Sequence, residues 1–252
     1  MTENIDARRT SFGAQADSYT NYRPGYPDQV FDYLIETVGR PASDISVIDI
    51  GAGTGQLTAG FVERGCTVTA VEPDDRMRAA LSERIEVDAA VAGSAESIPL
   101  PDASADLVTG AQMWHWVDPV KAIPEVARVL RPGGVFSIIW SLRDDNADWL
   151  KAMEEVVDLP DSYKWFRSND KPPLTEPFGE MALQEFAFSH TSTPEGLVGL
   201  VGTFSHVAIS DDREAIKEGI RQLAATHPDL AGRQTFEVPY IAKVFTAIRG
   251  AH

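Results

Sequence analysis

The chain contains one cysteine, Cys66, among its 252 residues. A lone cysteine cannot form an internal disulfide, and the opening MTENIDARRT has no apolar signal core, so we expect a reducing, cytoplasmic location. The five histidines are scattered, so no metal site is expected. No apolar run approaches the roughly 20 residues of a membrane-spanning helix, which excludes an integral membrane protein.

Basic residues are also scarce, since 22 Lys and Arg face 38 Asp and Glu, for a net charge of -16. Such a field repels phosphate backbones and anionic lipids, so neither a nucleic acid nor a membrane is expected as a partner. The 43% hydrophobic and 24% charged composition is that of a globular chain. The length suits one domain with an appended cap, and the oligomeric state is left open.

From Ser46 onward, apolar runs alternate with helical patterns. Buried strands are predicted at Val47–Ile50, Val68–Val71, Val87–Ala92, Asp106–Ala111 and Val135–Trp140. Helices are predicted at Leu57–Arg64, from Pro73 to Arg84, and at Pro119–Leu130, where Val120 and Ile123 belong to the apolar face. Strands and helices that alternate in this way imply parallel pairing with right-handed crossovers.

The flanking regions complete the expected fold, an α/β, doubly wound, mostly parallel seven-stranded sheet with an antiparallel last strand. The single domain, 1–252, divides into an N-terminal arm or lid (1–27), a core (28–158) and a helical cap insert (194–228). The core begins with a helix over Asp28–Val38 and ends with one near Asp148–Val157. Strands at Ala182–Ser192 and Thr235–Ile248 are expected to pair at the edge of the sheet.

Three alternate glycines, Gly51, Gly53 and Gly55, follow the first predicted strand in VIDIGAGTGQ. Glycine lets the backbone approach a ligand closely, and the start of the next helix leaves amides free to bind it. A nicotinamide fingerprint requires glycine where Gln56 stands, which argues against an oxidoreductase. A ligand-free turn is the alternative, but it would cost backbone entropy without structural gain.

An acidic residue, Glu72, ends the second strand about 20 positions after Gly51. Doubly wound folds place an acid here to accept the ribose hydroxyls of a nucleotide-like ligand. Acids before helices also serve as caps, and Asp74 is the better candidate for that role.

Four segments in order, VIDIGAGTGQ, VTAVEPDDRM, GSAESIPLPDASADLV and ARVLRPGGVF, resemble the successive motifs of class I S-adenosylmethionine-dependent methyltransferases of the small-molecule group. The resemblance implies the Rossmann-like methyltransferase fold and S-adenosyl-L-methionine as cofactor. It assigns cofactor binding to Gly51, Ala52, Gly53, Gln56, Glu72, Pro73, Met77, Ser94, Ala95, Glu96 and Ala111. Many members carry Asp where this chain has Ser94, so either Ser94 or Glu96 would contact the adenine amino group.

A narrower resemblance rests on QMWHWVD, FGAQADSYTNYRPGYP, WSLRD and TFSHV. These segments are similar to those of the trans-aconitate methyltransferase-like subgroup, whose characterised members methylate small carboxylates. A small acidic or polar acceptor is therefore expected. A module that binds the cofactor without turnover, or a macromolecular acceptor, is the alternative.

Methyl transfer from a sulfonium is an in-line displacement, so positioning supplies much of the rate enhancement. A carboxylate acceptor is already ionised, whereas a hydroxyl or carbon nucleophile usually needs a base. His115, after the fourth strand, is the candidate base, or a hydrogen-bond donor if the acceptor is a carboxylate. In the alternative interpretation, His115 and Trp116 only pack the loop.

Other side chains are expected to contact the ligands. Tyr19, Tyr22 and Arg23 belong to the arm, where aromatic faces suit a sulfonium and Arg23 suits the cofactor carboxylate. Arg143 is expected to bind an acidic acceptor beside His115, at the carboxyl edge of the sheet. Substrate contacts are predicted for Trp114, Trp116, Trp140 and Ser205.

Overall fold

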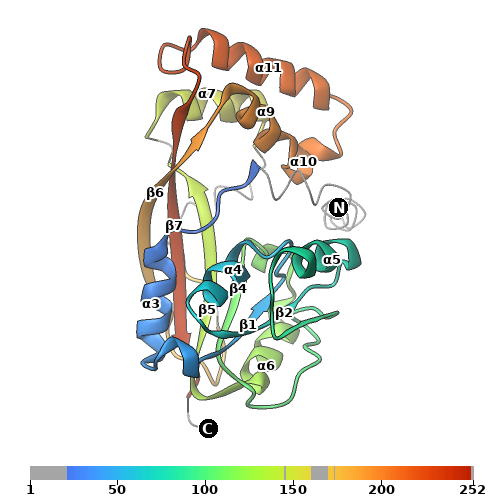
Figure 1. Ribbon diagram of the computed structural model, residues 1–252, viewed down its shortest axis with the longest axis vertical. Helices are drawn as coiled ribbons and strands as arrows, with labels where there is room; N and C mark the ends of the chain where they lie inside the picture. The colour runs from blue at the N-terminus through green and yellow to red at the C-terminus, as the bar shows by residue number, and fades with distance from the viewer. Residues whose placement is uncertain (1–21, 145, 160–169, 173, 251–252) are drawn as a thin grey trace. The chain divides into compact units, whose positions relative to one another are not determined.

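The computed structural model describes residues 22–144, 146–159, 170–172 and 174–250. One seven-stranded sheet runs in the order β3-β2-β1-β4-β5-β7-β6 (Figure 1). Its strands are β1 (Ser46–Ile50), β2 (Thr67–Val71), β3 (Ala89–Val91), β4 (Ala105–Ala111), β5 (Leu130–Arg143), β6 (Ala182–Ser192) and β7 (Phe236–Ile248). The sheet is mostly parallel with β7 antiparallel to its neighbours, so the predicted fold class is confirmed.

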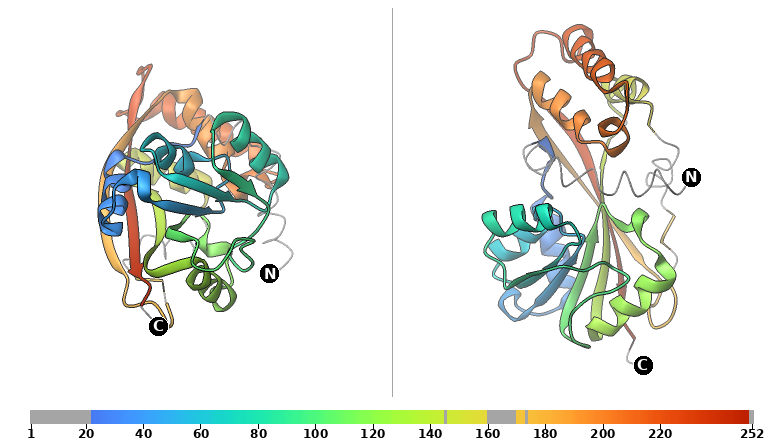
Figure 2. Two further views of the ribbon diagram at one scale, coloured as in Figure 1. Left: turned by 60° about the horizontal axis from the view of Figure 1, so that its bottom comes forward. Right: turned by 90° about the vertical axis from the view of Figure 1, so that its right-hand side faces the viewer.

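Helices cover both faces of the sheet, as Figure 2 shows for α4 and α5 on one side and α6 on the other. The helices are α3 (Asp28–Val38), α4 (Gln56–Glu63), α5 (Asp75–Arg84), α6 (Pro119–Val129), α7 (Asp148–Val157), α9 (Pro194–Gly202), α10 (Ser205–Ala208) and α11 (Arg213–Thr226). Short 3-10 turns occupy Ala42–Asp44 and Trp114–Trp116. Strands β1 and β4 are buried almost throughout, as is usual for parallel strands covered on both faces.

Parallel register brings the ends of three strands to one edge. Ile50 of β1 pairs with Val71 of β2 and with Gly110 of β4. The residues that follow these strands, among them Gly51 and Glu72, therefore emerge together at the carboxyl edge.

Two details of the predicted helices are wrong. Helix α5 begins at Asp75 because the Asp74 carboxylate caps it by accepting the amides of Arg76 and Met77, so Pro73 lies outside the helix. Val120 in α6 is 82% exposed instead of buried. Its amide donates to the capping Asp118, which fixes the first turn with Val120 facing solvent.

The chain divides into two compact units. Within the described residues, the sheet unit comprises 25–141, 170–186 and 242–250, and the helical unit comprises 22–24, 142–159 and 187–241, apart from the gaps given above. The boundaries fall within or next to β5, β6 and β7, so these three strands contribute residues to both units.

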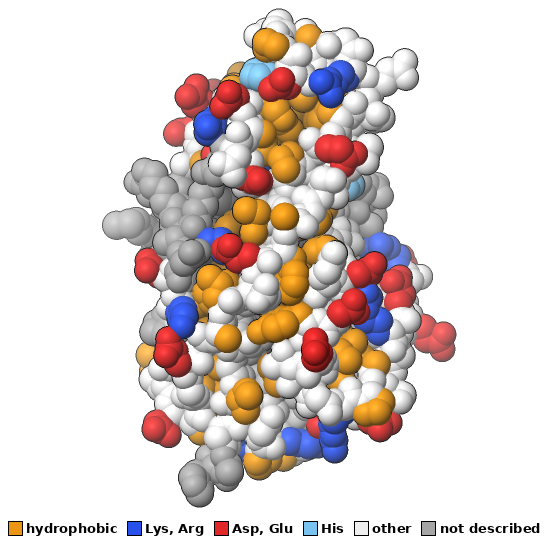
Figure 3. Space-filling view, turned by 90° about the vertical axis from the view of Figure 1, so that its left-hand side faces the viewer, with side chains coloured by type: hydrophobic (Ala, Val, Ile, Leu, Met, Phe, Trp, Pro, Cys, Tyr) orange, Lys and Arg blue, Asp and Glu red, His pale blue; other side chains and the backbone are white. Residues whose placement is uncertain are grey.

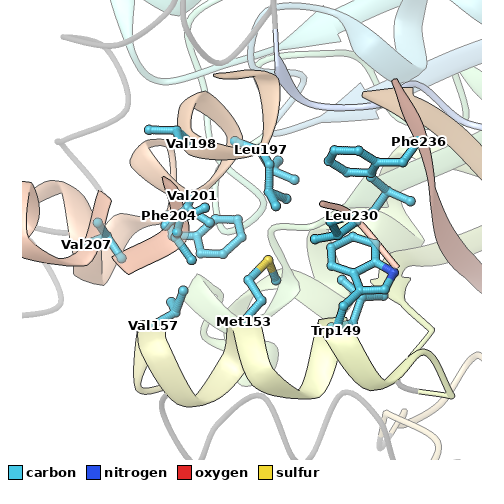
Figure 4. Close-up of a cluster of buried hydrophobic side chains, with 14 of the residues drawn as sticks. Trp149, Met153, Val157, Leu197, Val198, Val201, Phe204, Val207, Leu230 and Phe236 are labelled. Carbon is cyan, nitrogen blue, oxygen red and sulfur yellow. The ribbon is translucent and has the colours of Figure 1, made fainter. Parts of the chain in front are cut away.

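The helical unit has a hydrophobic core of its own (Figure 4). Trp149 and Met153 of α7 pack with Leu197 of α9 and with Phe236 at the start of β7. The rings of Trp149 and Phe236 meet edge to face, with their centroids 5.5 Å apart. The predicted insert is thus a packed helical layer with a separate core.

Among the described residues, the large hydrophobic side chains that are exposed are Tyr22, Val120, Ile209 and Ile248. On the face in Figure 3, acidic and basic side chains are interspersed, with hydrophobic side chains between them. No helix within the described ranges is both long and apolar enough to span a bilayer.

A close contact between α3 and α4 fixes the helices beside the sheet. A Cβ built on Gly60 would lie 2.2 Å from Cζ of Phe31. The Phe31 ring cannot easily yield, because Phe61 packs edge-on against it at 5.1 Å and the Arg64 guanidinium lies over it at 4.5 Å. Glycine at position 60 is therefore a packing requirement.

We expect Gly60→Ala to lower the free energy of unfolding by up to about 2 kcal/mol, because overpacking costs about 1–3 kcal/mol and better helix propensity returns only about 1 kcal/mol. Denaturant unfolding measures the change. Gly25→Ala is the control, since a Cβ there meets no atom within 4 Å. A Gly60→Ala protein as stable as the wild type would contradict this packing.

Candidate functional site

The glycine turn after β1 is held in a backbone conformation that favours glycine. Gly51, Gly53 and Gly55 have φ angles of 64°, 57° and 87°. The amides of the glycines themselves are hydrogen-bonded within the protein. Gly51 donates to the Val71 carbonyl at 2.8 Å, and Gly55 donates to the Ala52 carbonyl at 2.9 Å.

The Glu72 carboxylate connects this turn to the turn after β2. Its Oε2 accepts the amide of Gly53 at 2.8 Å, and its Oε1 accepts the amide of Asp74 at 2.9 Å. Glu72 is buried, and burial raises its pKa above the usual glutamate value, while the two amides oppose that rise. Each carboxylate oxygen keeps further acceptor capacity, so Glu72 can also accept hydroxyl groups from a ligand.

A second buried acid, Asp49, lies in β1. Thr58 of α4 donates to its Oδ2 at 2.6 Å, and Thr109 of β4 donates to its Oδ1 at 3.2 Å. Full burial, assisted by the nearby charge of Glu72, raises the pKa of Asp49 to about 6. One carboxylate thereby joins β1, β4 and the helix that follows the glycine turn.

The turn after β4 packs against the glycine turn. A Cβ on Gly51 would lie 2.9 Å from Cγ of Met113, so Met113 closely approaches the Gly51 backbone. Gln112 has a positive φ of 57°, and it is fixed by its Nε2 donating to the Ser141 carbonyl at 2.7 Å. Strained backbone of this kind often marks functional sites.

His115 lies in a row of aromatic rings. Its ring is 4.4 Å from that of Trp116 and 5.3 Å from that of Trp140, measured between centroids. His115 is exposed, whereas Trp140 is buried. Trp114, a predicted substrate contact, is buried against Phe136, with the ring centroids 5.1 Å apart, so it packs inside the sheet unit.

The predicted adenine segment follows β3. Ser94 and Ser97 exchange backbone hydrogen bonds, which make a tight turn around the buried Ala95. The Glu96 carboxylate accepts the amide of Asp118, the N-cap of α6, at 3.0 Å. The Glu96 side chain therefore already binds the protein through one oxygen.

The other predicted cofactor residues lie along the same edge of the sheet unit. Met77 is buried in the first turn of α5, and Pro73 is exposed just before that helix. Ala111 and Gln56, at the end of β4 and the start of α4, are half-buried.

Arg143 and Ser205 belong to the helical unit, whereas His115 belongs to the sheet unit. The Arg143 guanidinium lies 4.7 Å from the centroid of the Phe204 ring. Ser205 begins α10 and is half-buried.

Of the predicted arm, Tyr19 lies outside the described residues, while Tyr22 and Arg23 are placed. A Cβ on Gly199 of α9 would lie 2.6 Å from the Tyr22 ring. Arg23 donates from Nε to Oγ1 of Thr203 at 3.1 Å and from Nη2 to the Thr203 carbonyl at 3.2 Å. These contacts attach the end of the arm to α9, within the helical unit.

Comparison with known proteins agrees with this architecture. A family profile described as "Methyltransferase domain" matches residues 48–138. An uncharacterized methyltransferase of Mycobacterium bovis is 40% identical over 233 residues, which cover 92% of each chain. The chain belongs to the class I S-adenosylmethionine-dependent methyltransferases. The family assignment confirms the predicted enzyme class and cofactor.

Solved structures share the methyltransferase fold. A protein from Anaeromyxobacter dehalogenans, described as a candidate Type II methyltransferase, has a TM-score of 0.65 at 24% identity, over 92% of this chain and 100% of that one. A Haemonchus contortus phosphoethanolamine N-methyltransferase, in complex with S-adenosylhomocysteine, has a TM-score of 0.52 at 16% identity, over 94% of this chain and 57% of that one.

The residues at the edge of the sheet fit the methyltransferase cofactor. Nothing lies within 4 Å of a Cβ built on Gly53, so that turn has open space beside its backbone. Glu72 adds a buried acceptor next to it. When bound, S-adenosylmethionine supplies an electrophilic methyl group on a sulfonium.

Sequence reasoning missed the residues that support the glycine turn from behind. Asp49 was detectable as an acid within an otherwise apolar strand. Met113 and Gln112 carried no comparable signal, because their roles depend on contacts with Gly51 and β5.

Asp49 should make stability depend on pH. The pKa of Asp49 in the folded state, about 6, exceeds the usual aspartate value of 3.8, so the native state binds one more proton than the unfolded chain between these pH values. The contribution of Asp49 to the free energy of unfolding therefore falls by at most about 3 kcal/mol as the pH rises from about 4 to 6. We expect Asp49→Asn to remove this loss, as measured by denaturant unfolding between pH 4 and 7.

Asp88→Asn, at an exposed position of the same unit, is the control and should keep the wild-type pH dependence. An Asp49→Asn protein with the same pH dependence as the wild type would show that Asp49 ionises normally.

Proposed function

We propose that this methyltransferase acts on a small, acidic or polar metabolite by in-line methyl transfer. The main support is the contact between the turns after β1 and β2. Glu72 accepts the Gly53 amide, and open space lies beside the Gly53 backbone. Glu72 and the glycine turn would hold the ribose and methionine parts of the cofactor. Met77, Ser94, Ala95 and Ala111 remain predicted contacts to it.

His115 is the residue of the sheet unit that we assign to the acceptor. It is exposed, and its ring contacts two indole rings at a tilt of 43°, with Trp116 nearer than Trp140. Aromatic faces stabilise a cation, which favours His115 as a hydrogen-bond donor or positive charge toward an acidic acceptor. Trp116 and Trp140 would then form apolar walls, as small-molecule sites usually have.

The resemblance to trans-aconitate methyltransferases supports an acidic acceptor, and the net charge of -16 disfavours nucleic acid. A macromolecular acceptor and a cofactor-binding module without turnover are the alternatives. A screen of metabolite pools with radiolabelled S-adenosylmethionine tests all three. Label in small anionic compounds supports the proposal, label only in protein or RNA favours the macromolecular acceptor, and cofactor binding without any transfer favours the module.

Once an acceptor is found, His115→Gln tests the role of the imidazole. For an acidic acceptor we expect measurable turnover, a KM raised up to about tenfold by the loss of a charge-assisted contact, and a rate that stays flat through neutral pH. Steady-state kinetics across pH provide the measurement, with His190→Gln as control.

A collapse of kcat in His115→Gln, together with loss of the decline at acidic pH, would contradict the donor role. It would instead show that the imidazole is a general base for a hydroxyl or carbon nucleophile.

A further inference from the structure

The helical unit contains a buried arginine whose charge is poorly compensated. The Arg143 side chain is 9% exposed, and its nearest carboxylate oxygen, Oε1 of Glu154, lies 3.8 Å from Nη2. This distance is too long for a hydrogen bond. The Arg143 Nε is buried without a hydrogen-bond partner among the described residues.

A buried tyrosine lies close to the same arginine. Tyr240 is 4% exposed, and its hydroxyl has no hydrogen-bond partner within the described ranges. Strands β5 and β7 are neighbours, and the Asp144 amide donates to the Pro239 carbonyl at 2.9 Å, so Arg143 and Tyr240 lie next to a direct contact between their two strands. Burial raises the Tyr240 pKa, while the charges of Arg143 and Arg23 lower it. A buried hydroxyl without a partner is unfavourable, so a bound ligand would satisfy it.

Two cations gather around one apolar ring. The guanidinium carbons of Arg143 and Arg23 lie 4.7 Å and 5.6 Å from the centroid of Phe204. Thr203 fixes Arg23 through two hydrogen bonds. In the described part of the helical unit, Glu154 is the carboxylate that an ion pair joins to Arg143. Arg143 is the buried cation of the two, and a buried charge is costly unless its N–H groups are hydrogen-bonded.

We propose that Arg143 and Tyr240 form a carboxylate-binding subsite in the helical unit, with Arg23 adding positive charge. A guanidinium edge offers parallel N–H donors that match a planar carboxylate, and the phenol supplies an O–H. The inference rests on the proposed function, which takes the methyl acceptor to be acidic.

Thermal unfolding with acetate, succinate or benzoate tests the subsite, with inorganic phosphate and chloride compared at equal ionic strength. At a carboxylate concentration of about ten times Kd, we expect the wild-type Tm to rise by about 3–6 °C relative to chloride. Arg143→Gln should abolish the rise, and Tyr240→Phe should reduce it by more than half. Arg221→Gln, in a half-exposed pair with Glu218, should retain it.

Carboxylates that stabilise Arg143→Gln and Tyr240→Phe as much as the wild type would overturn the subsite. Stronger protection by phosphate than by any carboxylate would overturn the ligand class. If Arg143→Gln fails to fold, the rise in Tm of the nearly isosteric Tyr240→Phe protein with carboxylates decides whether the subsite exists. Titration of S-adenosylhomocysteine in the same samples separates the two proposals. Normal binding of S-adenosylhomocysteine, with no rise in Tm from carboxylates, contradicts only the subsite. Absence of S-adenosylhomocysteine binding contradicts the proposed function.

Discussion

The two hydrogen bonds accepted by Glu72 are the constraint on which the cofactor edge of the sheet depends. One oxygen holds the amide of Gly53 after β1, and the other holds the amide of Asp74 after β2. The parallel register brings these turns together, and the carboxylate fixes their relative position. A single buried side chain thus both shapes the glycine turn and offers acceptors to a ligand.

A second layer of polar contacts supports this edge from inside the sheet. Asp49 joins β1 to α4 and β4 through Thr58 and Thr109. Its raised pKa shows that burial outweighs these hydrogen bonds. Two buried acids in one sheet edge, with the charge of Glu72 adding to the rise in the Asp49 pKa, are unfavourable for stability. Such groups are often kept where a fold maintains a functional surface.

Much of this architecture was predictable because it follows from local patterns. The bounds of α3 and α7 match the sequence prediction, and the strand–helix alternation gave the parallel core. The Val120 prediction failed because helical spacing alone does not decide which residues of the first turn face solvent. The engaged amides of the glycine turn and the attachment of Arg23 to Thr203 were unpredictable, since both depend on residues distant in sequence.

Calorimetric titration of S-adenosylhomocysteine into wild type and Glu72→Gln tests the role of Glu72 most directly. The amide cannot accept both backbone N–H groups and the ribose hydroxyls, so affinity should fall by about 10- to 100-fold, equivalent to about 1–3 kcal/mol. Glu86→Gln, at an exposed position of the sheet unit, should bind like the wild type. Unchanged affinity in Glu72→Gln would contradict the central role of this carboxylate.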